Sequence, residues 1–296
     1  MVSTLEFTED PAWFLAEAKA HLAAEPVVTT VIATVTARLA ERPVGRDNDA
    51  PYRWWAIARD ERDGVAGVAM RTAPFPPYPV YVLAMPDDAA VLLARTLRER
   101  GEEVGGVNGA LPATRVFAEE YARLAGREVA VHEHLRLFEL GELQMPPAPP
   151  GRLRPAALDD AELCLAWFRD FESAAAEQAG RAGTHGIGES FTLEDMVDRI
   201  DAGVIWLWVD AEGEPVHLTG ANVPANGVTR IGPVYTPRQY RGRGYASRAV
   251  AEVSRRYVEQ GVRCCLFTDQ ANPTSNKIYE ALGYRPVVDM GSLVIR

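Results

Sequence analysis

The alternation of apolar and polar positions divides this chain into two runs of strands and helices with a proline-rich joint between them. The joint reads Gln144-Met145-Pro146-Pro147-Ala148-Pro149-Pro150-Gly151. Proline fixes a backbone angle and lacks an N–H donor, so such a segment excludes both helix and sheet. We therefore predict a first domain at residues 1–145, a linker at residues 146–151 and a second domain at residues 152–296.

In the second half, β-prone runs predict strands at residues 151–155, 204–209, 215–223, 229–236, 263–269 and 290–296. Helical periodicity predicts helices at residues 159–171, 192–201, 245–260 and 274–282. Strands that alternate with helices favour layered α/β domains.

The first half repeats this order of elements. Helices are expected at residues 11–24, 27–41, 87–100 and 113–125. Strands are expected at residues 52–59, 65–71, 80–85, 104–107, 129–131 and 135–139. The shared order, rather than matched residues, predicts that the two halves are a degenerate tandem repeat.

Composition narrows the possible functions. The net charge of −10 argues against general nucleic-acid binding, and it is compatible with a cationic amine substrate, although solubility is the commoner reason for an acidic balance. No run of about 18 apolar residues predicts a membrane span, and the N-terminus has no apolar signal segment. The three cysteines are odd in number and two are adjacent. We therefore expect buried thiols in the cytoplasm, with no disulfide framework and no metal site.

The most informative segment begins where a predicted strand ends at Pro237. The loop Arg241-Gly242-Arg243-Gly244-Tyr245-Ala246 follows and leads into a helix. Unpaired N–H groups and a partial positive charge at a helix start attract anions, and glycines let the backbone approach a ligand closely. This combination predicts a cradle for a pyrophosphate, with Arg241 and Arg243 as rim charges. Taken alone, the loop is equally compatible with an exposed turn that binds nothing.

Two other phosphate-binding folds fit this loop poorly. Ser247 stands where a dinucleotide-binding fingerprint needs glycine or alanine, and no acidic residue follows in the required register. The loop also lacks the Gly-Lys-Ser/Thr sequence of nucleoside triphosphatases.

A second polar motif follows the strand predicted at residues 263–269. Asn272 stands at the cap position of a helix that closes at Gly283. Asn272, Asn276 and Tyr279 are spaced four and three residues apart, so they share one helical face. Capping alone is an open alternative for Asn272, and core packing is one for Tyr279.

Together the two motifs resemble the GNAT superfamily of coenzyme A-dependent N-acetyltransferases. Its first motif, Arg/Gln-x-x-Gly-x-Gly/Ala, is matched by Arg241, Gly244 and Ala246. Its second motif, Asn-x-x-Ala/Ser-x-x-x-Tyr-Glu-x-x-Gly-Phe/Tyr, is matched by Asn272, Ser275, Tyr279, Glu280, Gly283 and Tyr284. The Val-Tyr-Thr-Pro sequence before the loop is similar to a bacterial subgroup often built as tandem domains, although Arg238 replaces its usual second proline. The resemblance implies two tandem α/β (α+β) domains, each a mixed, mostly antiparallel sheet with helices on both faces.

The resemblance also implies a reaction, the transfer of an acetyl group from acetyl-CoA to a primary amine of a small molecule or peptide. The implied coenzyme-binding residues are Val234, Tyr235, Thr236, Arg241, Gly242, Arg243, Gly244, Tyr245, Ala246, Asn272, Ser275 and Asn276. Tyr279 would be the catalytic acid that protonates the departing thiolate, a role that suits a phenol. The alternative from another functional class is a non-catalytic acyl-CoA sensor.

The first half lacks the glycine loop. Met85-Pro86-Asp87-Asp88-Ala89-Ala90 stands in its place. Two carboxylates there would repel a pyrophosphate, although they equally suit a helix start. We therefore predict that residues 1–145 form a degenerate companion domain without coenzyme.

The resemblance carries over no general base. Candidate bases in the second half are Glu172, Glu177, Glu189, Glu194 and His217, and His185 lies in a glycine-rich stretch that could contact substrate. Each of the candidate bases is individually more typical of a solvated surface group. Trp206 and Trp208 share one face of a strand, where we expect core packing rather than substrate stacking.

Overall fold

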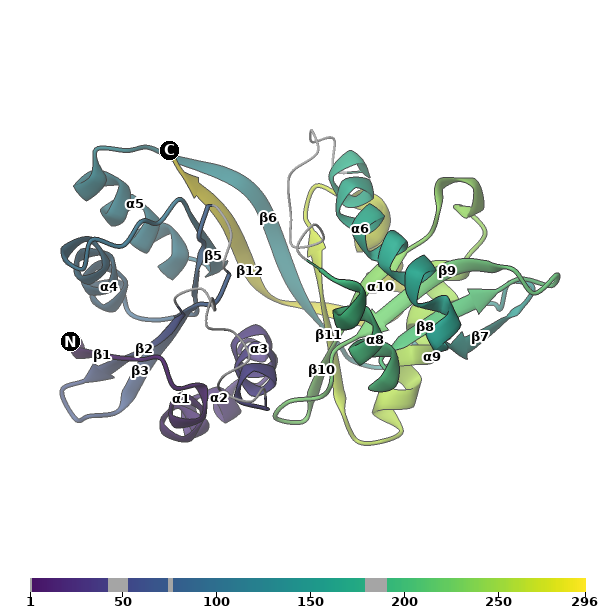
Figure 1. Ribbon diagram of the computed structural model, residues 1–296, viewed down its shortest axis with the longest axis horizontal. Coiled ribbons are helices and arrows are strands. Elements are labelled where there is room, and N and C mark those ends of the chain that lie inside the picture. Colours follow the sequence, from purple (N-terminus) through teal and green to yellow (C-terminus); the bar gives the residue numbers. More distant parts are fainter. Residues whose placement is uncertain (1, 42–52, 74–76, 179–190) are drawn as a thin grey trace. The chain divides into compact units, whose positions relative to one another are not determined.

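The computed structural model describes residues 2–41, 53–73, 77–178 and 191–296, which fall into two compact units (Figure 1). Unit 1 comprises Met1–Leu137 and Val287–Arg296, and unit 2 comprises Phe138–Pro286. The boundary therefore lies before the predicted linker, and the C-terminal segment belongs to unit 1 rather than to the second domain.

Unit 1 is a sheet with helices on both faces. Across the sheet the strands follow the order β1 (Val2–Thr8), β2 (Trp54–Asp60), β3 (Val65–Arg71), β4 (Val80–Val82), β5 (Gly106–Ala110), β12 (Tyr284–Ile295) and β6 (Val129–Leu140). The helices are α1 (Pro11–Glu17), α2 (Lys19–Ala24), α3 (Thr30–Glu41), α4 (Asp87–Glu99) and α5 (Ala113–Ala125). Strands β4 and β5 are parallel, whereas β1 to β4 and the pair β5–β12 are antiparallel.

Strand β2 explains why both faces of this sheet are covered. Successive side chains of a strand point to opposite faces. Trp54 and Ala56 therefore pack in the core that contains α4 and α5. Trp55 and Ile57 pack in the core that contains α1, α2 and α3. Successive apolar residues of β2 therefore pack alternately against one helix layer and the other.

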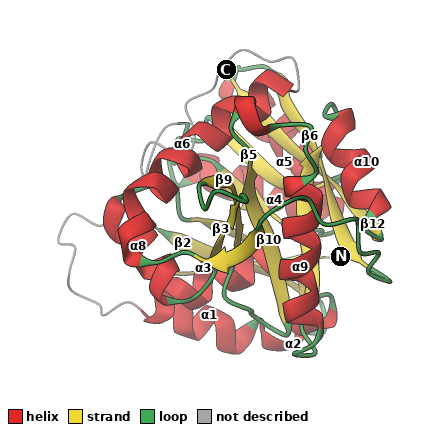
Figure 2. Cartoon of the chain, turned by 90° about the vertical axis from the view of Figure 1, so that its right-hand side faces the viewer, coloured by secondary structure: helices red, strands yellow, loops and turns green. Residues whose placement is uncertain are grey.

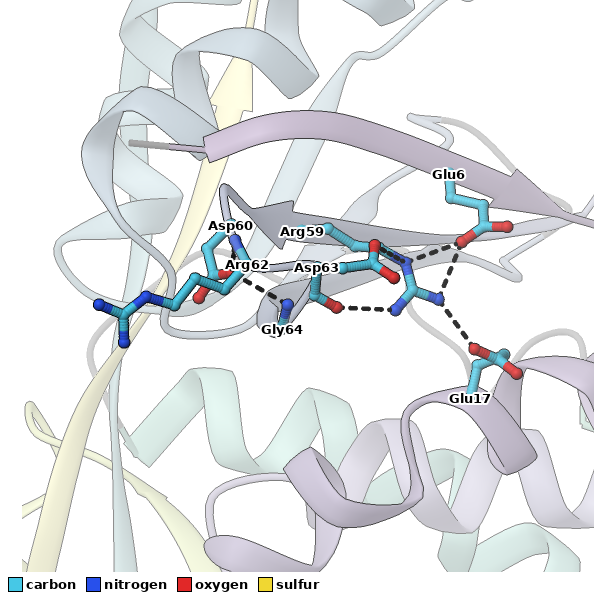
Figure 3. A network of polar contacts seen from close by, with 7 residues as sticks. All are labelled: Glu6, Glu17, Arg59, Asp60, Arg62, Asp63 and Gly64. Carbon is cyan, nitrogen blue, oxygen red and sulfur yellow. Dashed lines mark hydrogen bonds and ion pairs between the residues drawn. The ribbon is translucent and has the colours of Figure 1, made fainter.

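Arg59 joins three elements of unit 1 (Figure 3). Its guanidinium lies 3.0 Å from the Glu6 carboxylate on β1 and 2.8 Å from the Glu17 carboxylate on α1. It also donates a 3.3 Å hydrogen bond to the Asp63 carbonyl in the β2–β3 turn. Hydrogen bonds with Glu17 and Glu6 hold the pKa of Arg59 above its usual value. The charge is therefore permanent, and we interpret the cluster as a structural clamp.

Unit 2 repeats this architecture. Its strands are the end of β6, then β11 (Arg263–Asp269), β10 (Val228–Tyr235), β9 (Pro215–Ala221), β8 (Ile205–Val209) and β7 (Arg152–Pro155), in spatial order. Its α-helices are α6 (Ala161–Gln178), α8 (Leu193–Asp201), α9 (Tyr245–Val258) and α10 (Pro273–Ala281). Short 3-10 helices are η1 (Leu158–Asp160) and η2 (Arg238–Tyr240). Strands β10 and β11 are parallel, and β7 to β10 are antiparallel.

The faces of the unit 2 sheet are covered by different helices (Figure 2). Trp206 and Trp208 pack with residues of α9 and α10, which confirms the expected core role of these indoles. Ile205 and Leu207 point the other way and pack with α6 and α8. The three cysteines are buried and free, as expected. Each unit is thus a mixed, mostly antiparallel sheet between two helix layers, as predicted.

Strands β6 and β12 each contribute residues to both units. The second part of β12 pairs with β5, from Met290 opposite Ala110 to Val294 opposite Gly106. This long-range pairing places the C-terminal segment in unit 1. The two strands predicted at residues 129–131 and 135–139 are a single strand, β6. The polar residues between them belong to the strand, because a strand accommodates polar side chains at half-buried and exposed positions.

Two other expectations near the N-terminus were wrong. Strand β1 is absent from the predicted elements, since the alternation of Leu5 and Phe7 with polar residues is short and the pairing with β2 decides its state. The single helix predicted at residues 11–24 is two helices, α1 and α2, which meet at Ala18.

Candidate functional site

The central feature of unit 2 is a parallel strand pair that separates part-way along its length. Strand β10 pairs with β11 only from Val228 opposite Arg263 to Arg230 opposite Cys265. On its other edge β10 remains paired with β9 as far as Tyr235. The pairing register with β9 shifts between Ile231 and Val234. Among the described strands, the last part of β10 therefore has no partner on this edge, and such an edge offers main-chain donors and acceptors to a ligand.

The glycine loop follows directly after this open edge. Gly242 and Gly244 have φ of 76° and 83°, in the left-handed region that glycine adopts without strain. A Cβ at either position would meet nothing within 4 Å, so the backbone angle rather than crowding requires glycine. Helix α9 starts at Tyr245 without a side-chain cap. The N–H groups of its first turn therefore have no side-chain acceptor at the cap position, and the exposed loop before them contains no carboxylate.

The two arginines of the loop have different environments. Arg241 Nε donates a 3.0 Å hydrogen bond to the Thr236 carbonyl, so this side chain ties the loop to the end of β10. Arg243 is exposed, and its guanidinium lies 5.8 Å from the centre of the Tyr240 ring. Of the two predicted rim charges, Arg243 is the one held at the surface.

The second motif forms the start of α10. Asn272 is 6% exposed, and its side-chain oxygen accepts a 3.1 Å hydrogen bond from the Ser275 N–H. Asn272 therefore caps the helix, which is the alternative to ligand binding that the sequence left open. The Asn276 side-chain nitrogen donates to the Asp269 carbonyl at 3.2 Å and to the Gln270 carbonyl at 3.4 Å. Both asparagines thus shape the turn between β11 and α10.

Tyr279 lies on α10 and is 8% exposed. Its ring packs edge-on against Tyr284, with 6.1 Å between ring centres. Burial raises the pKa of Tyr279 to about 12, so the phenol keeps its proton at all physiological pH values. Its hydroxyl makes no hydrogen bond within the described part of the chain, and it is thus available to a ligand that reaches it.

His217 has no access to solvent. It is 0% exposed on β9, and both ring nitrogens contact threonine hydroxyls at 2.7 Å. Burial lowers its pKa to about 3. A ring in this state cannot take a proton from a substrate, so the structure removes His217 from the candidate bases.

Of the other candidate bases, only Glu194 has a described side chain. Glu194 is exposed on α8. Glu189 and His185 lie outside the described residues, as do the side chains of Glu172 and Glu177. No group of three or more acidic, histidine or cysteine side chains in the described ranges could hold a metal ion.

A shallow cavity of about 290 Å³ adjoins the start of α9 and the C-terminal half of α10. Its lining residues are Gln144, Met145, Pro146, Ser247, Lys277, Ile278, Ala281 and Leu282. One positive charge, that of Lys277, accompanies a mostly apolar lining. The first residues of the proline-rich joint, Gln144 to Pro146, thus form one wall of a space next to Ser247, a role that their sequence did not reveal.

On the sheet face opposite α9, an aromatic pair lies beside the open edge of β10. The Tyr235 ring packs against Trp167 of α6, with 6.0 Å between ring centres. The Tyr235 hydroxyl lies 3.5 Å from a carboxylate oxygen of the exposed Asp170. The sequence placed Tyr235 only among the implied coenzyme-binding residues, and it did not single out the two α6 side chains, because nothing local indicates which face of that helix meets β10.

Comparison with known proteins identifies this architecture. Residues 211–290 match the family model described as FR47-like protein, which covers the open edge, the loop and α10. The whole chain superimposes on solved structures of the GNAT family. The chain has the GNAT fold. The resemblance suggested by the two motifs is thereby confirmed.

Three solved structures illustrate the match. A GCN5-related N-acetyltransferase from Sphaerobacter thermophilus is 18% identical, with 99% of this chain and 96% of that chain covered and a TM-score of 0.60. A GNAT-family acetyltransferase from Colwellia psychrerythraea is 11% identical, with 99% of both chains covered and a TM-score of 0.58. A tandem GNAT protein from the clavulanic acid biosynthesis pathway is 15% identical, with 99% and 98% covered and a TM-score of 0.57. These matches span both units, so the chain comprises two GNAT-like domains.

No curated protein matches the chain at a significant level. None of the described helices is long and apolar enough to cross a membrane.

Proposed function

We propose that unit 2 binds acetyl-CoA and transfers its acetyl group to a primary amine. The observation that carries this proposal is the separation of β10 from β11, which leads directly to the uncapped start of α9. An open strand edge suits the amide groups of a pantetheine arm, and a helix start behind a glycine loop suits a pyrophosphate.

The residues present fit such a ligand. The open edge at Val234, Tyr235 and Thr236 lies next to the loop from Arg241 to Ala246, which carries two arginines and no acidic side chain. A cavity lined by Lys277 of α10 begins at Ser247, the residue that follows the loop. Asn272, Ser275 and Asn276 shape the turn after β11, and we assign them the support of the same site.

Bound acetyl-CoA would supply a thioester, whose C–S bond breaks as the amine nitrogen bonds to the acetyl carbon. The protonated Tyr279 hydroxyl is the group that we assign as proton donor to the departing sulfur. Its raised pKa keeps the proton in place before the reaction, and a thiolate formed in the same apolar surroundings is a correspondingly stronger base. The amine proton leaves through another base or water.

The acceptor approaches from the α6 face in this proposal, because the α9 face carries the phosphate end of the coenzyme. Trp167 and Tyr235 offer aromatic surface there, and Asp170 offers a negative charge. This lining favours an amine that carries a positive charge, as does the net charge of −10.

The proposal is tested by measuring coenzyme A release from acetyl-CoA in the presence of amines. The panel should include polyamines, amino acids, aminoglycosides and peptide N-termini. Amine-dependent release above the hydrolysis background supports the transferase. Tight binding of acetyl-CoA by calorimetry without turnover of any amine would instead favour the acyl-CoA sensor.

A further inference from the structure

We propose that Thr219, His217 and Thr236 form a hydrogen-bond chain of fixed direction, which makes the Thr236 hydroxyl a donor to an oxygen of the bound coenzyme arm. His217 is then a positioning residue rather than a catalytic base. The proposal rests on the proposed coenzyme site and adds to it two side chains that belong to neither motif.

The chain consists of two short contacts around one imidazole. His217 Nδ1 lies 2.7 Å from Thr236 Oγ1, and Nε2 lies 2.7 Å from Thr219 Oγ1. His217 and Thr219 are both 0% exposed on β9. They lie opposite Trp208 and Trp206 of β8, within the apolar core on the α9 face. Burial lowers the pKa of His217 to about 3, so the ring is neutral at physiological pH.

The direction follows from counting donors and acceptors. A neutral imidazole has one N–H donor and one bare nitrogen, so one threonine must donate to it and the other must accept. The Thr219 hydroxyl makes no other hydrogen bond within the described part of the chain, and it is closed to water. If Thr219 accepted from Nε2, its own O–H would be buried without a partner, which is unfavourable. Thr219 therefore donates to Nε2, and Nδ1–H donates to Thr236.

Of the two ends of this hydrogen-bond chain, Thr219 is fully buried and Thr236 reaches the surface. It is half-buried and follows directly after the open edge of β10. Its carbonyl accepts from Arg241 Nε at 3.0 Å, so its backbone is held as well as its side chain. Because its Oγ1 already accepts from His217, its O–H is left to donate. The partner that such a donor needs is an oxygen acceptor, either a pantetheine amide carbonyl or a phosphate oxygen.

The first test determines, without any ligand, which ring nitrogen of His217 carries the proton. Long-range nitrogen–proton NMR distinguishes the two tautomers of a histidine ring, and the H217Q variant assigns the signals of His217 among the five histidines. We expect the Nδ1–H tautomer from about pH 5 to pH 8. The Nε2–H tautomer would overturn the proposal. This readout is independent of coenzyme binding, so it stands apart from any failure of the proposed function.

The second test measures coenzyme A affinity by calorimetry in Thr236→Val and Thr236→Ser. Loss of one hydrogen bond should weaken binding about 3- to 10-fold in T236V, whereas T236S retains the hydroxyl and should stay within about twofold of wild type. Thr229→Val is the matched control. Thr229 is a buried threonine in the paired part of β10, so T229V should lower stability and leave affinity unchanged.

Fragments of the coenzyme locate the acceptor oxygen. If it is an amide carbonyl, T236V weakens pantetheine and leaves ADP unaffected; if it is a phosphate oxygen, the reverse holds. Unchanged affinity of folded T236V for coenzyme A and both fragments would refute the donor role. Failure of the wild-type protein to bind coenzyme A at all would instead refute the proposed function.

Discussion

The two units contain the same strand–helix–strand crossover, but they differ where a coenzyme would enter. In unit 1, the short strand β4 is paired with β5 over its whole length, from Val80 opposite Val107 to Val82 opposite Gly109. A Cβ on Gly109 would lie 1.8 Å from the Val82 carbonyl oxygen, so these two backbones are in close contact. In unit 2, β10 continues for several residues after its pairing with β11 has stopped.

The helices that follow these strands, α4 in unit 1 and α9 in unit 2, also differ in how well their starts suit an anion. Helix α4 of unit 1 begins with Asp87 and Asp88, and the Asp88 carboxylate accepts from the Ala89 N–H at 2.9 Å. Neither α4 nor α9 has a side-chain cap, but the first turn of α4 carries two carboxylates whereas the first turn of α9 carries none. The comparison teaches that the architecture alone does not provide a site. The proposed coenzyme site of unit 2 depends on a strand that continues past its partner and on a helix start without acidic side chains.

The largest expected effect comes from closing the loop of unit 2. Gly244→Asp places a side chain and a negative charge at a residue with φ of 83°, in front of the α9 N–H groups. We expect affinity for coenzyme A to fall at least about 100-fold, because several hydrogen bonds to a charged group are lost together. Calorimetry measures the loss. Gly213→Asp is the matched control, because Gly213 also has a left-handed backbone, φ 94°, in an open turn. Affinity retained in folded G244D would show that the pyrophosphate binds elsewhere.

Removal of the proposed acid should have the next largest effect. Tyr279→Phe keeps the buried ring, so turnover should fall roughly 10²–10⁴-fold while the KM for acetyl-CoA changes little. Steady-state kinetics separate the two parameters. Tyr257→Phe, at another buried tyrosine of unit 2, should leave turnover near wild type. Wild-type turnover in Y279F, under conditions where chemistry limits the rate, would move the acid role to another group.

Buried His217 on β9 should make the stability of unit 2 depend on pH. The corresponding strand of unit 1 is β3, where the apolar residues Ala69 and Met70 pair with β4 and no such dependence is expected. Burial lowers the pKa of His217 from 6.5 to about 3, so the unfolded chain takes up the proton first as the pH falls. This contribution is complete above pH 6.5 and declines below it. Between pH 7 and pH 5 the free energy of unfolding should fall by about 2 kcal/mol.

Urea unfolding of the wild type and of H217Q measures this difference. The variant should lose less stability over the same pH interval, since its side chain does not titrate. Equal losses in the two proteins would mean that other groups account for the pH dependence.

The smallest expected effect distinguishes two possible reasons why unit 1 is predicted not to bind coenzyme. We expect one coenzyme A per chain by calorimetry, and the same ratio in the double variant Asp87→Asn, Asp88→Asn. Neutral side chains would remove the repulsion but would leave β4 and β5 paired. A ratio of two in the variant would show that charge alone, rather than the closed strand pair, prevents binding in unit 1.

The local parts of this picture could be predicted from the sequence. The glycine loop requires left-handed backbone angles at Gly242 and Gly244, Asn272 caps a helix, and the alternating Trp206 and Trp208 lie on one strand face. Each of these depends on a few neighbouring residues, so a local pattern is enough to reveal it. The fold of two tandem GNAT-like domains followed from the order of such elements together with the two motifs.

Only the tertiary structure decided where the paired part of β10 and β11 ends, and that Arg241 ties the loop to Thr236. It also brought His217 to Thr236 and the C-terminal strand to β5. These contacts join residues that are distant in the chain or lie across a turn whose geometry no periodicity specifies. Their energies depend on pairing register and burial, which arise only once the sheet has formed. The sequence by itself therefore determined which groups are present, and the fold decided which of them meet.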